Sequence, residues 1–144
     1  MGCSVTHYWE EHIANLEAKL SVVVDCQPAS ESMIRLIDGN PREGIIEARI
    51  FFFDENAFLD VIERVSIREG EPPRRLKYTY HFQVDGEFVE RFDYDPKLPE
   101  PLQHHVNRPG GIHLPSNRTS LKKAIEACYD LLDVIRNDSG PDDD

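Results

Sequence analysis

The sequence has no acidic residue in one long segment. It contains 27 Asp and Glu among 144 residues and a formal net charge of −11 at pH 7, yet none of these acids lies between Pro101 and Ile125. Histidine is the side chain whose charge ordinarily changes near neutral pH. The segment therefore suits an anionic partner, a proton transfer or a metal ion, and its composition leaves all three open. Its basic and imidazole residues are His104, His105, Arg108, His113, Arg118, Lys122 and Lys123.

Cysteines and long apolar runs are also scarce. Cys3, Cys26 and Cys128 are widely spaced and form neither a zinc-type pair nor a disulfide framework, which predicts reduced thiols and a cytoplasmic location. No apolar run reaches the roughly 18 residues of a membrane span, and the start lacks the pattern of a secretory signal. The motifs GxxxxGK[ST], GxGxxG and GxSxG are absent, so the sequence contains no nucleophile motif. No cofactor is predicted. The acidic excess argues against nonspecific binding to a phosphate backbone.

The two ends of the chain have helical periodicity. Residues 7–20 form a predicted helix with Thr6 as its N-cap, and Thr119 or Ser120 is expected to cap a second helix near the C-terminus. In each helix, apolar residues recur on one face that should be buried. These residues are Trp9, Ile13, Leu16 and Leu20 in the first helix, and Leu121, Ala124, Ile125, Cys128, Leu132 and Ile135 in the second.

Between the helices the pattern changes to that of strands. Short apolar runs at 22–24 and 33–37 precede a turn at 38–41, and strands are predicted at 45–53, 58–67, 78–84 and 88–94. Three successive hairpin signals, including Asp85-Gly86, predict an antiparallel meander. Five prolines and Gly110-Gly111 predict irregular structure over residues 95–118.

These elements define a predicted architecture. We expect an α+β fold in which an antiparallel sheet of hairpins is flanked by the N-terminal and C-terminal helices, packed on one face. Residues 1–137 should form a single domain, and residues 138–144 a disordered acidic tail.

His81 is the first candidate for chemistry. Symmetric pairing about Asp85-Gly86 places His81 near Glu90, with an uncertainty of about one residue, and a histidine oriented by a carboxylate can act as a general base. Adjacent rings such as those of His104 and His105 point apart on an extended backbone, so the pair cannot easily bind one metal ion. A metal site from His81, one histidine of the pair, His113 and Asp93 remains an alternative.

Four short motifs, taken in order, resemble the TumE-type toxin family. They are Tyr78-Thr79-Tyr80-His81, Arg91-Phe92-Asp93-Tyr94, His104-His105, and a closing helix introduced by Leu114-Pro115-Ser116. The resemblance spans roughly residues 45–135. The chain departs from the family pattern at Gln103, where the family has the proline before the histidine pair, and at Asn107, where it has a third histidine.

The resemblance implies a toxin of a type II toxin–antitoxin pair, with a small helix-turn-helix antitoxin as partner and RNA cleavage as one way to block translation. In a metal-independent ribonuclease, one group deprotonates the 2′-OH, another protonates the leaving oxygen, and arginine stabilises the phosphorane. A non-catalytic protein-binding module with structural histidines is the competing interpretation, and the oligomeric state stays open. The catalytic candidates are His81, Arg91, His104 and His105, and the substrate-binding candidates are Asp93, Arg108, His113 and Arg118.

Overall fold

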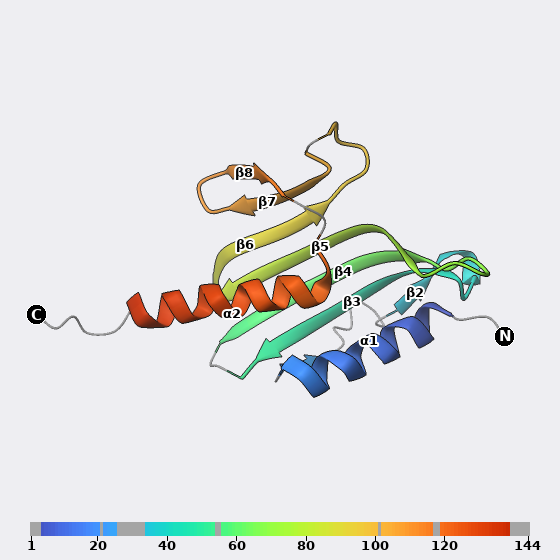
Figure 1. Ribbon diagram of the computed structural model, residues 1–144, viewed down its shortest axis with the longest axis horizontal. Coiled ribbons are helices and arrows are strands. Elements are labelled where there is room, and N and C mark those ends of the chain that lie inside the picture. The colour runs from blue at the N-terminus through green and yellow to red at the C-terminus, as the bar shows by residue number, and fades with distance from the viewer. Residues whose placement is uncertain are drawn as a thin grey trace, which may run out of the picture.

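The computed structural model describes residues 4–20, 22–25, 34–53, 56–100, 102–116 and 119–138. Within these ranges the chain forms one antiparallel sheet of eight strands with a helix at each end, which confirms the predicted α+β class (Figure 1). The elements are α1 (Val5–Leu20), β1 (Val22–Asp25), β2 (Ile34–Leu36), a short 3-10 helix η1 (Ile37–Gly39), β3 (Glu43–Phe52), β4 (Ala57–Ser66), β5 (Arg74–Val84), β6 (Glu87–Tyr94), β7 (His104–Arg108), β8 (Ile112–Pro115) and α2 (Leu121–Asp138).

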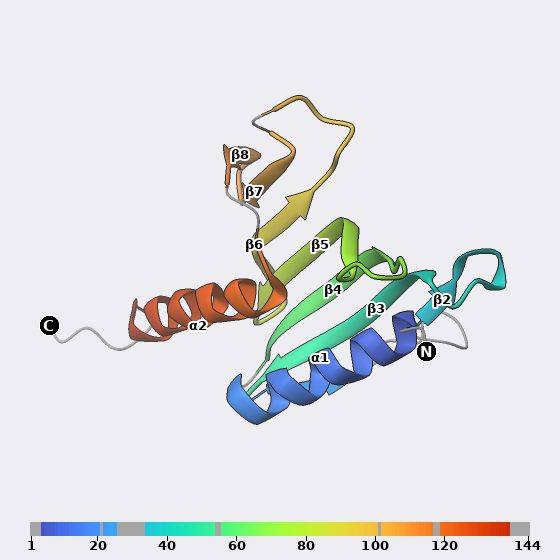
Figure 2. The same cartoon turned by 45° about the vertical axis from the view of Figure 1, so that its right-hand side comes forward.

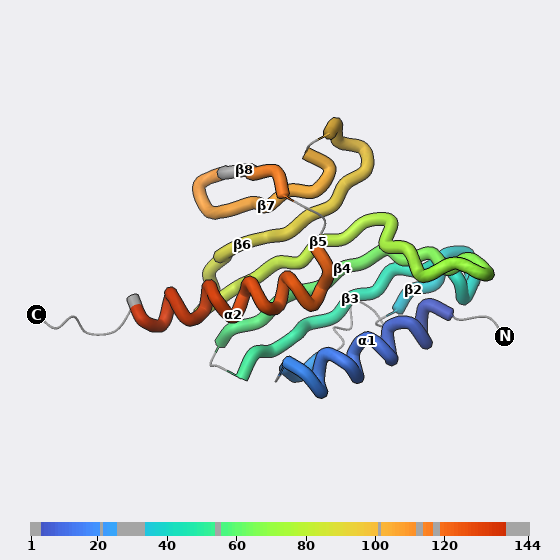
Figure 3. The backbone as a smooth tube through the Cα atoms, in the orientation of Figure 1, coloured from blue at the N-terminus to red at the C-terminus, as the bar shows by residue number. Residues whose placement is uncertain are grey.

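The sheet is a meander over most of its width. Its strand order is β1-β3-β4-β5-β6-β7-β8, with β2 also paired to β3. β2 pairs with residues 44–46 of β3 and β1 with residues 49–52, so these two short strands share one neighbour. Figure 3 follows the backbone through β6, β7 and β8, the strands at the opposite edge.

Both helices lie on the same face of the sheet (Figures 1 and 2). α1 contacts β1, β2 and β3, whereas α2 contacts β5. Strand side chains that face the helices are buried, as Tyr78, Tyr80 and Phe82 of β5 illustrate. The alternating side chains, such as Thr79 and His81, project from the other side. We call this second side, on which neither described helix lies, the open face.

The predicted helix stripes form the core. Trp9 and Leu16 are buried in α1, and Ile13 and Leu20 pack against them from partly buried positions. In α2 the whole predicted stripe is buried apart from Ile135, which is half-buried against the same core. No helix among the described residues is long and apolar enough to cross a membrane.

The N-terminal cap differs from the prediction. α1 begins one residue before Thr6, and the Ser4 hydroxyl accepts a hydrogen bond from the His7 N–H at 3.1 Å. Ser4 is therefore the cap, because its side chain satisfies an amide that the first helical turn leaves free. In α2 the predicted Ser120 cap is confirmed, with the Lys123 N–H donating to its hydroxyl at 3.1 Å.

Leu132 tests the packing of α2. Its side chain is 5% exposed in the core. Leu132→Ala is expected to lower the free energy of unfolding by about 2–5 kcal/mol, because it removes buried methyl groups and leaves a cavity. Val134→Ala is the matched control, since Val134 is 57% exposed on the same helix. Urea denaturation of both variants measures the difference, and equal midpoints would contradict a buried stripe.

The region predicted to be irregular contains a hairpin. Residues 104–108 and 112–115 form β7 and β8 around Gly110 and Gly111, whose φ angles of 88° and 76° need glycine. The prolines do not prevent pairing because of where they lie: Pro109 follows the end of β7, and Pro115 is the last residue of the edge strand β8. Proline is compatible with edge strands because its missing N–H leaves no ladder bond unmade there.

The partner of His81 also differs from the prediction. The Asp85-Gly86 turn has positive φ at both residues, and Gln83 pairs with Phe88 as symmetric pairing predicts. A bulge then shifts the register, so that His81 pairs with Arg91 instead of Glu90. Glu90 pairs with Phe82 and lies on the helix-covered face.

A polar network joins the helices to the sheet inside the core. Glu63 of β4 is fully buried, and its carboxylate accepts hydrogen bonds from the Tyr8 hydroxyl of α1 at 3.1 Å and from the Tyr80 hydroxyl of β5. Arg75 donates to the Tyr80 hydroxyl and to the Thr119 carbonyl, each at 2.7 Å. The network therefore connects α1, two central strands and the start of α2.

Several predictions concern residues outside the described ranges. These include Cys3, Cys26, Arg118 and the acidic tail beyond Asp138, which is the last residue of α2. The extent of the single domain stays a prediction.

Candidate functional site

Four of the predicted site residues share the open face. His81 pairs with Arg91, and Arg91 pairs with Asn107 on the next strand. Two residues away along the same strands, Asp93 pairs with His105. Because directly opposite residues of an antiparallel pair project from the same side, His81, Arg91, Asp93 and His105 all belong to the open face.

Asp93 is the centre of this group. Its buried carboxylate accepts hydrogen bonds from Arg91 Nε at 2.8 Å and from Asn107 Nδ2 at 2.5 Å. His105 Nε2 lies 3.5 Å from the same oxygen. Asp93 therefore holds Arg91 in place, and the amide of Asn107 supplies a donor at the position where the family pattern has a histidine.

The orientation of His105 follows from its two neighbours. Its Nδ1 lies 2.9 Å from the Leu102 carbonyl oxygen. A carbonyl only accepts, so Nδ1 carries the proton and donates it. Nε2 then faces Asp93, and when both ring nitrogens are protonated it has an anionic acceptor nearby. His105 therefore has an acceptor beside each ring nitrogen, the Leu102 carbonyl and the Asp93 carboxylate.

His81 lies between a negatively charged and a positively charged side chain. It pairs with Asp60 on one side and Arg91 on the other, and its ring contacts the edge of Phe88 with centroids 5.1 Å apart. Burial lowers the pKa of His81 below its ordinary 6.5, and the Arg91 charge lowers it further, while Asp60 and Asp93 oppose the shift. His81 is therefore mainly neutral at pH 7 and free to accept a proton.

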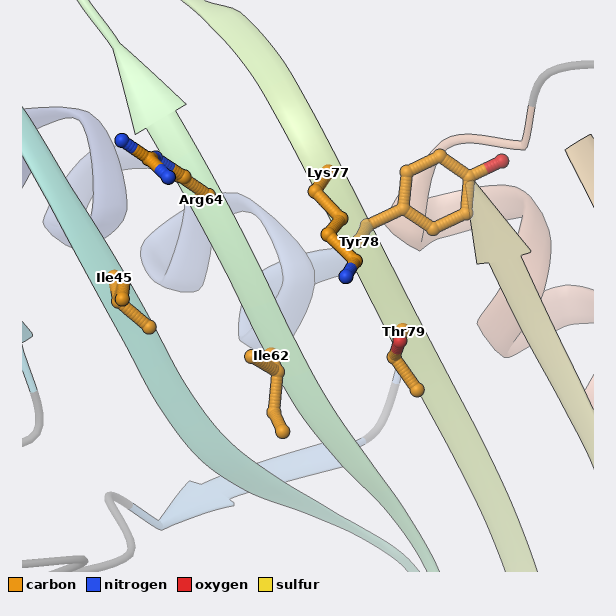
Figure 4. A pocket seen from close by; sticks show the side chains of 6 residues that line it. All are labelled: Ile45, Ile62, Arg64, Lys77, Tyr78 and Thr79. Atoms are coloured by element: carbon orange, nitrogen blue, oxygen red, sulfur yellow. The ribbon is translucent and has the colours of Figure 1, made fainter. Parts of the chain in front are cut away.

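Shallow hollows surround this group. One of about 330 Å³ is lined by residues that include Asp60, His81 and Arg91, and one of about 320 Å³ by residues that include Arg91, Asp93 and His105. Thr79 and Arg91 line both. A third, of about 370 Å³, adjoins them across Thr79 (Figure 4). Figure 4 views this third hollow with the helices behind the sheet. The site is an open groove rather than an enclosed pocket.

His104 and Arg108 lie on the opposite, helix-covered face. As predicted, the adjacent rings of His104 and His105 point apart. His104 stacks on Tyr94 with ring centroids 4.3 Å apart, and its Nδ1 lies 2.9 Å from the Tyr78 hydroxyl. That hydroxyl accepts the Thr119 N–H at 3.1 Å. Arg108 Nε donates to Glu90 at 2.8 Å.

The remaining site predictions are placed only in part. His113 of β8 pairs with Asn107 of β7. The side chain of His113 and the whole of Arg118 lie outside the described residues. Among the described residues, no three His, Cys, Asp or Glu side chains form a group that could hold a metal ion. Asp60 and Phe88 are additional members of the site that the sequence did not single out, and Asn107, noted there only as a departure from the family pattern, is a third.

The electrostatic environment of His81 can be tested by titration. The His81 ring resonances in an NMR pH titration are expected to have a midpoint below 6.5, the ordinary value. Arg91→Gln should raise that midpoint, because a nearby positive charge that disfavours the imidazolium is removed. Asp60→Asn should lower it, because an opposing negative charge is lost. Shifts of the opposite sign would contradict the described arrangement.

Comparison with known proteins identifies the class of the chain as a toxin. Residues 20–138 match the family described as Toxin TumE. This match covers well over half of the 144 residues, and the chain belongs to the TumE toxin family. Comparisons with curated proteins and with solved structures find no match.

Proposed function

We propose that this toxin cleaves RNA without a metal ion, at the group of His81, Arg91, Asp93 and His105 on the open face. The observation that carries the proposal is that a proton acceptor, a guanidinium and a second histidine line two adjoining hollows that share Thr79 and Arg91, with a buried carboxylate that orients two of them. We also propose that the toxin acts in the cytoplasm to block translation and is held in check by a small helix-turn-helix antitoxin.

The proposed reaction is an internal transesterification. Neutral His81 takes the proton of an RNA 2′-OH, and the 2′ oxygen attacks the adjacent phosphorus. Arg91 stabilises the negative charge of the phosphorane. Protonated His105 donates its proton to the 5′ oxygen as the P–O5′ bond breaks. The products are a 2′,3′-cyclic phosphate and a free 5′-OH.

The spacing of the two histidines is compatible with these roles. His81 and His105 are two strands apart and offset by two residues along the strand. Strand spacing and rise then place their Cα atoms about 12 Å apart. Arg91 of the intervening strand lies between them, paired with His81 and bonded to Asp93.

The other residues receive different roles in this proposal. Asp93 is a positioning residue, because it contacts Arg91 and His105 rather than the reacting atoms. We infer a structural role for His104, whose bonds join β7 to the start of α2. Arg108 is bound to Glu90 on the covered face and is not assigned to substrate.

Purified toxin tests the proposal directly. Incubation with single-stranded RNA in the presence of EDTA should yield fragments that end in 2′,3′-cyclic phosphates, which mass spectrometry identifies. The same sequence as DNA should remain intact, because it has no 2′-OH. Failure to cleave any RNA, although expression of the toxin arrests growth, would contradict RNA cleavage while leaving the toxin class untouched.

A further inference from the structure

A row of aromatic side chains crosses the open face beside the proposed cleavage site. Phe51 of β3 pairs with Phe58 of β4, whose neighbour Gln83 pairs in turn with Phe88 of β6. The rings of Phe51 and Phe58 have centroids 6.1 Å apart, and Phe88 contacts His81. Phe51 is 37% exposed. These three rings, which we call the aromatic row, lie outside the hydrophobic core.

A polar row runs parallel to the aromatic row. Arg49, Asp60, His81 and Arg91 are paired in succession, two residues from the aromatic row along β3, β4 and β5 and, because of the bulge, three residues along β6. The two rows are about 7 Å apart, from the rise of an antiparallel strand. The guanidinium of Arg49 joins them, because its carbon lies 3.9 Å above the Phe58 ring while its nitrogens bind Asp60.

The charge of the open face differs from that of the whole chain. The registers place slightly more Arg and Lys than Asp and Glu on this face, although the chain as a whole is strongly acidic. An anionic ligand is therefore repelled less here than elsewhere. The basic residues are Arg35, Arg49, Arg64, Arg74, Lys77 and Arg91, and the acidic residues are Asp25, Glu43, Glu47, Asp60 and Asp93.

We infer that the open face binds single-stranded RNA across its strands, with bases stacked on the aromatic row and the sugar–phosphate backbone along Arg49, His81 and Arg91. Unpaired bases stack on exposed aromatic rings, and positive groups beside those rings follow the backbone. In a duplex the bases are already stacked, so the preferred substrate is unpaired RNA. This inference rests on the proposed function, since it supplies the substrate-binding surface for that cleavage site.

Binding can be measured separately from cleavage. A fluorescent, 2′-O-methylated oligoadenylate has no free 2′-OH to attack phosphorus, so its anisotropy reports binding alone. Phe58→Leu should weaken binding by about 5- to 100-fold, the range for loss of one base–aromatic stack. Phe58→Tyr should retain affinity because it keeps an aromatic face. Val134→Ala on α2 is the control for general effects on the fold.

A second oligonucleotide provides a test that does not depend on how the variants fold. An oligoadenylate with abasic positions should bind the unaltered protein more weakly, and Phe58→Leu should then have little further effect. Equal affinity of the Leu and Tyr variants would overturn stacking and indicate an apolar docking surface for a protein. If the unaltered protein is a dimer in solution and Phe58→Leu makes it a monomer, the aromatic row binds a second copy of the chain and the inference is overturned. No binding by the unaltered protein would also overturn the inference, whereas binding without cleavage of natural RNA would contradict only the proposed reaction.

Discussion

His81→Ala is expected to slow RNA cleavage by about 10²–10⁴-fold, the usual contribution of a positioned general base. The ring lies between Asp60 and Arg91 at the edge of a groove, and its lowered pKa keeps it neutral at pH 7. The substitution removes a side chain of the open face that is not part of the hydrophobic core, so the circular-dichroism spectrum should be unchanged. Single-turnover cleavage of a labelled RNA measures the rate. The growth arrest caused by expressing the toxin in cells should be relieved by the same substitution.

His104→Ala is the matched control for this experiment. His104 is also a strand histidine beside a tyrosine, but it faces the helices and binds Tyr78. Its loss should reduce thermal stability while changing the cleavage rate far less than the loss of His81. Growth arrest that survives His81→Ala and Arg91→Ala would place the toxic activity elsewhere. If the unaltered protein causes no arrest at good expression, this chain is not an active toxin.

Glu63→Ala is expected to lower the free energy of unfolding by about 3 kcal/mol. The substitution leaves two buried tyrosine hydroxyls without their acceptor and removes the negative charge that interacts electrostatically with Arg75. Burial, reinforced by the charge of Glu63, raises the pKa values of Tyr8 and Tyr80, so both hydroxyls stay protonated and need an acceptor.

A conservative variant separates the hydrogen bonds from the charge. Glu63→Gln keeps one carbonyl acceptor in the same place and should cost less than the alanine substitution. Guanidinium denaturation of both variants gives the comparison. If the alanine variant is as stable as the unaltered protein, the network does not hold α1 and the start of α2 to the sheet in the way described.

Local patterns predicted the elements that local chemistry determines. The apolar stripe of α2 that includes Leu132 has the period of a helix, and the alternation around Tyr80 has the period of a strand. Asp85-Gly86 is a dipeptide that favours a tight turn. The β7–β8 hairpin was missed because the high number of prolines in that region was taken to exclude regular structure. Their effect depends on whether each lies inside a strand, at its end or on an edge, which a single sequence does not reveal.

The site was harder to predict because it depends on pairing between distant strands. One extra residue, Val89, shifts the register and exchanges Glu90 for Arg91 as the partner of His81. Asp60 joins His81 only through the pairing of β4 with β5, and nothing local to either strand signals that contact. The same holds for Glu63, which occupies an apolar position in β4 and is explained only by the tyrosines that reach it from other elements.

The opposed rings of His104 and His105 give β7 a connecting role. One ring is tied through Tyr78 and Thr119 to the beginning of α2, and the next ring along the chain borders Asp93 in the groove. The start of α2 and the strand that carries His105 are therefore connected by hydrogen bonds through the sheet. The two faces of the sheet, one carrying the helices and the other the proposed site, thus meet in two consecutive residues of a five-residue strand.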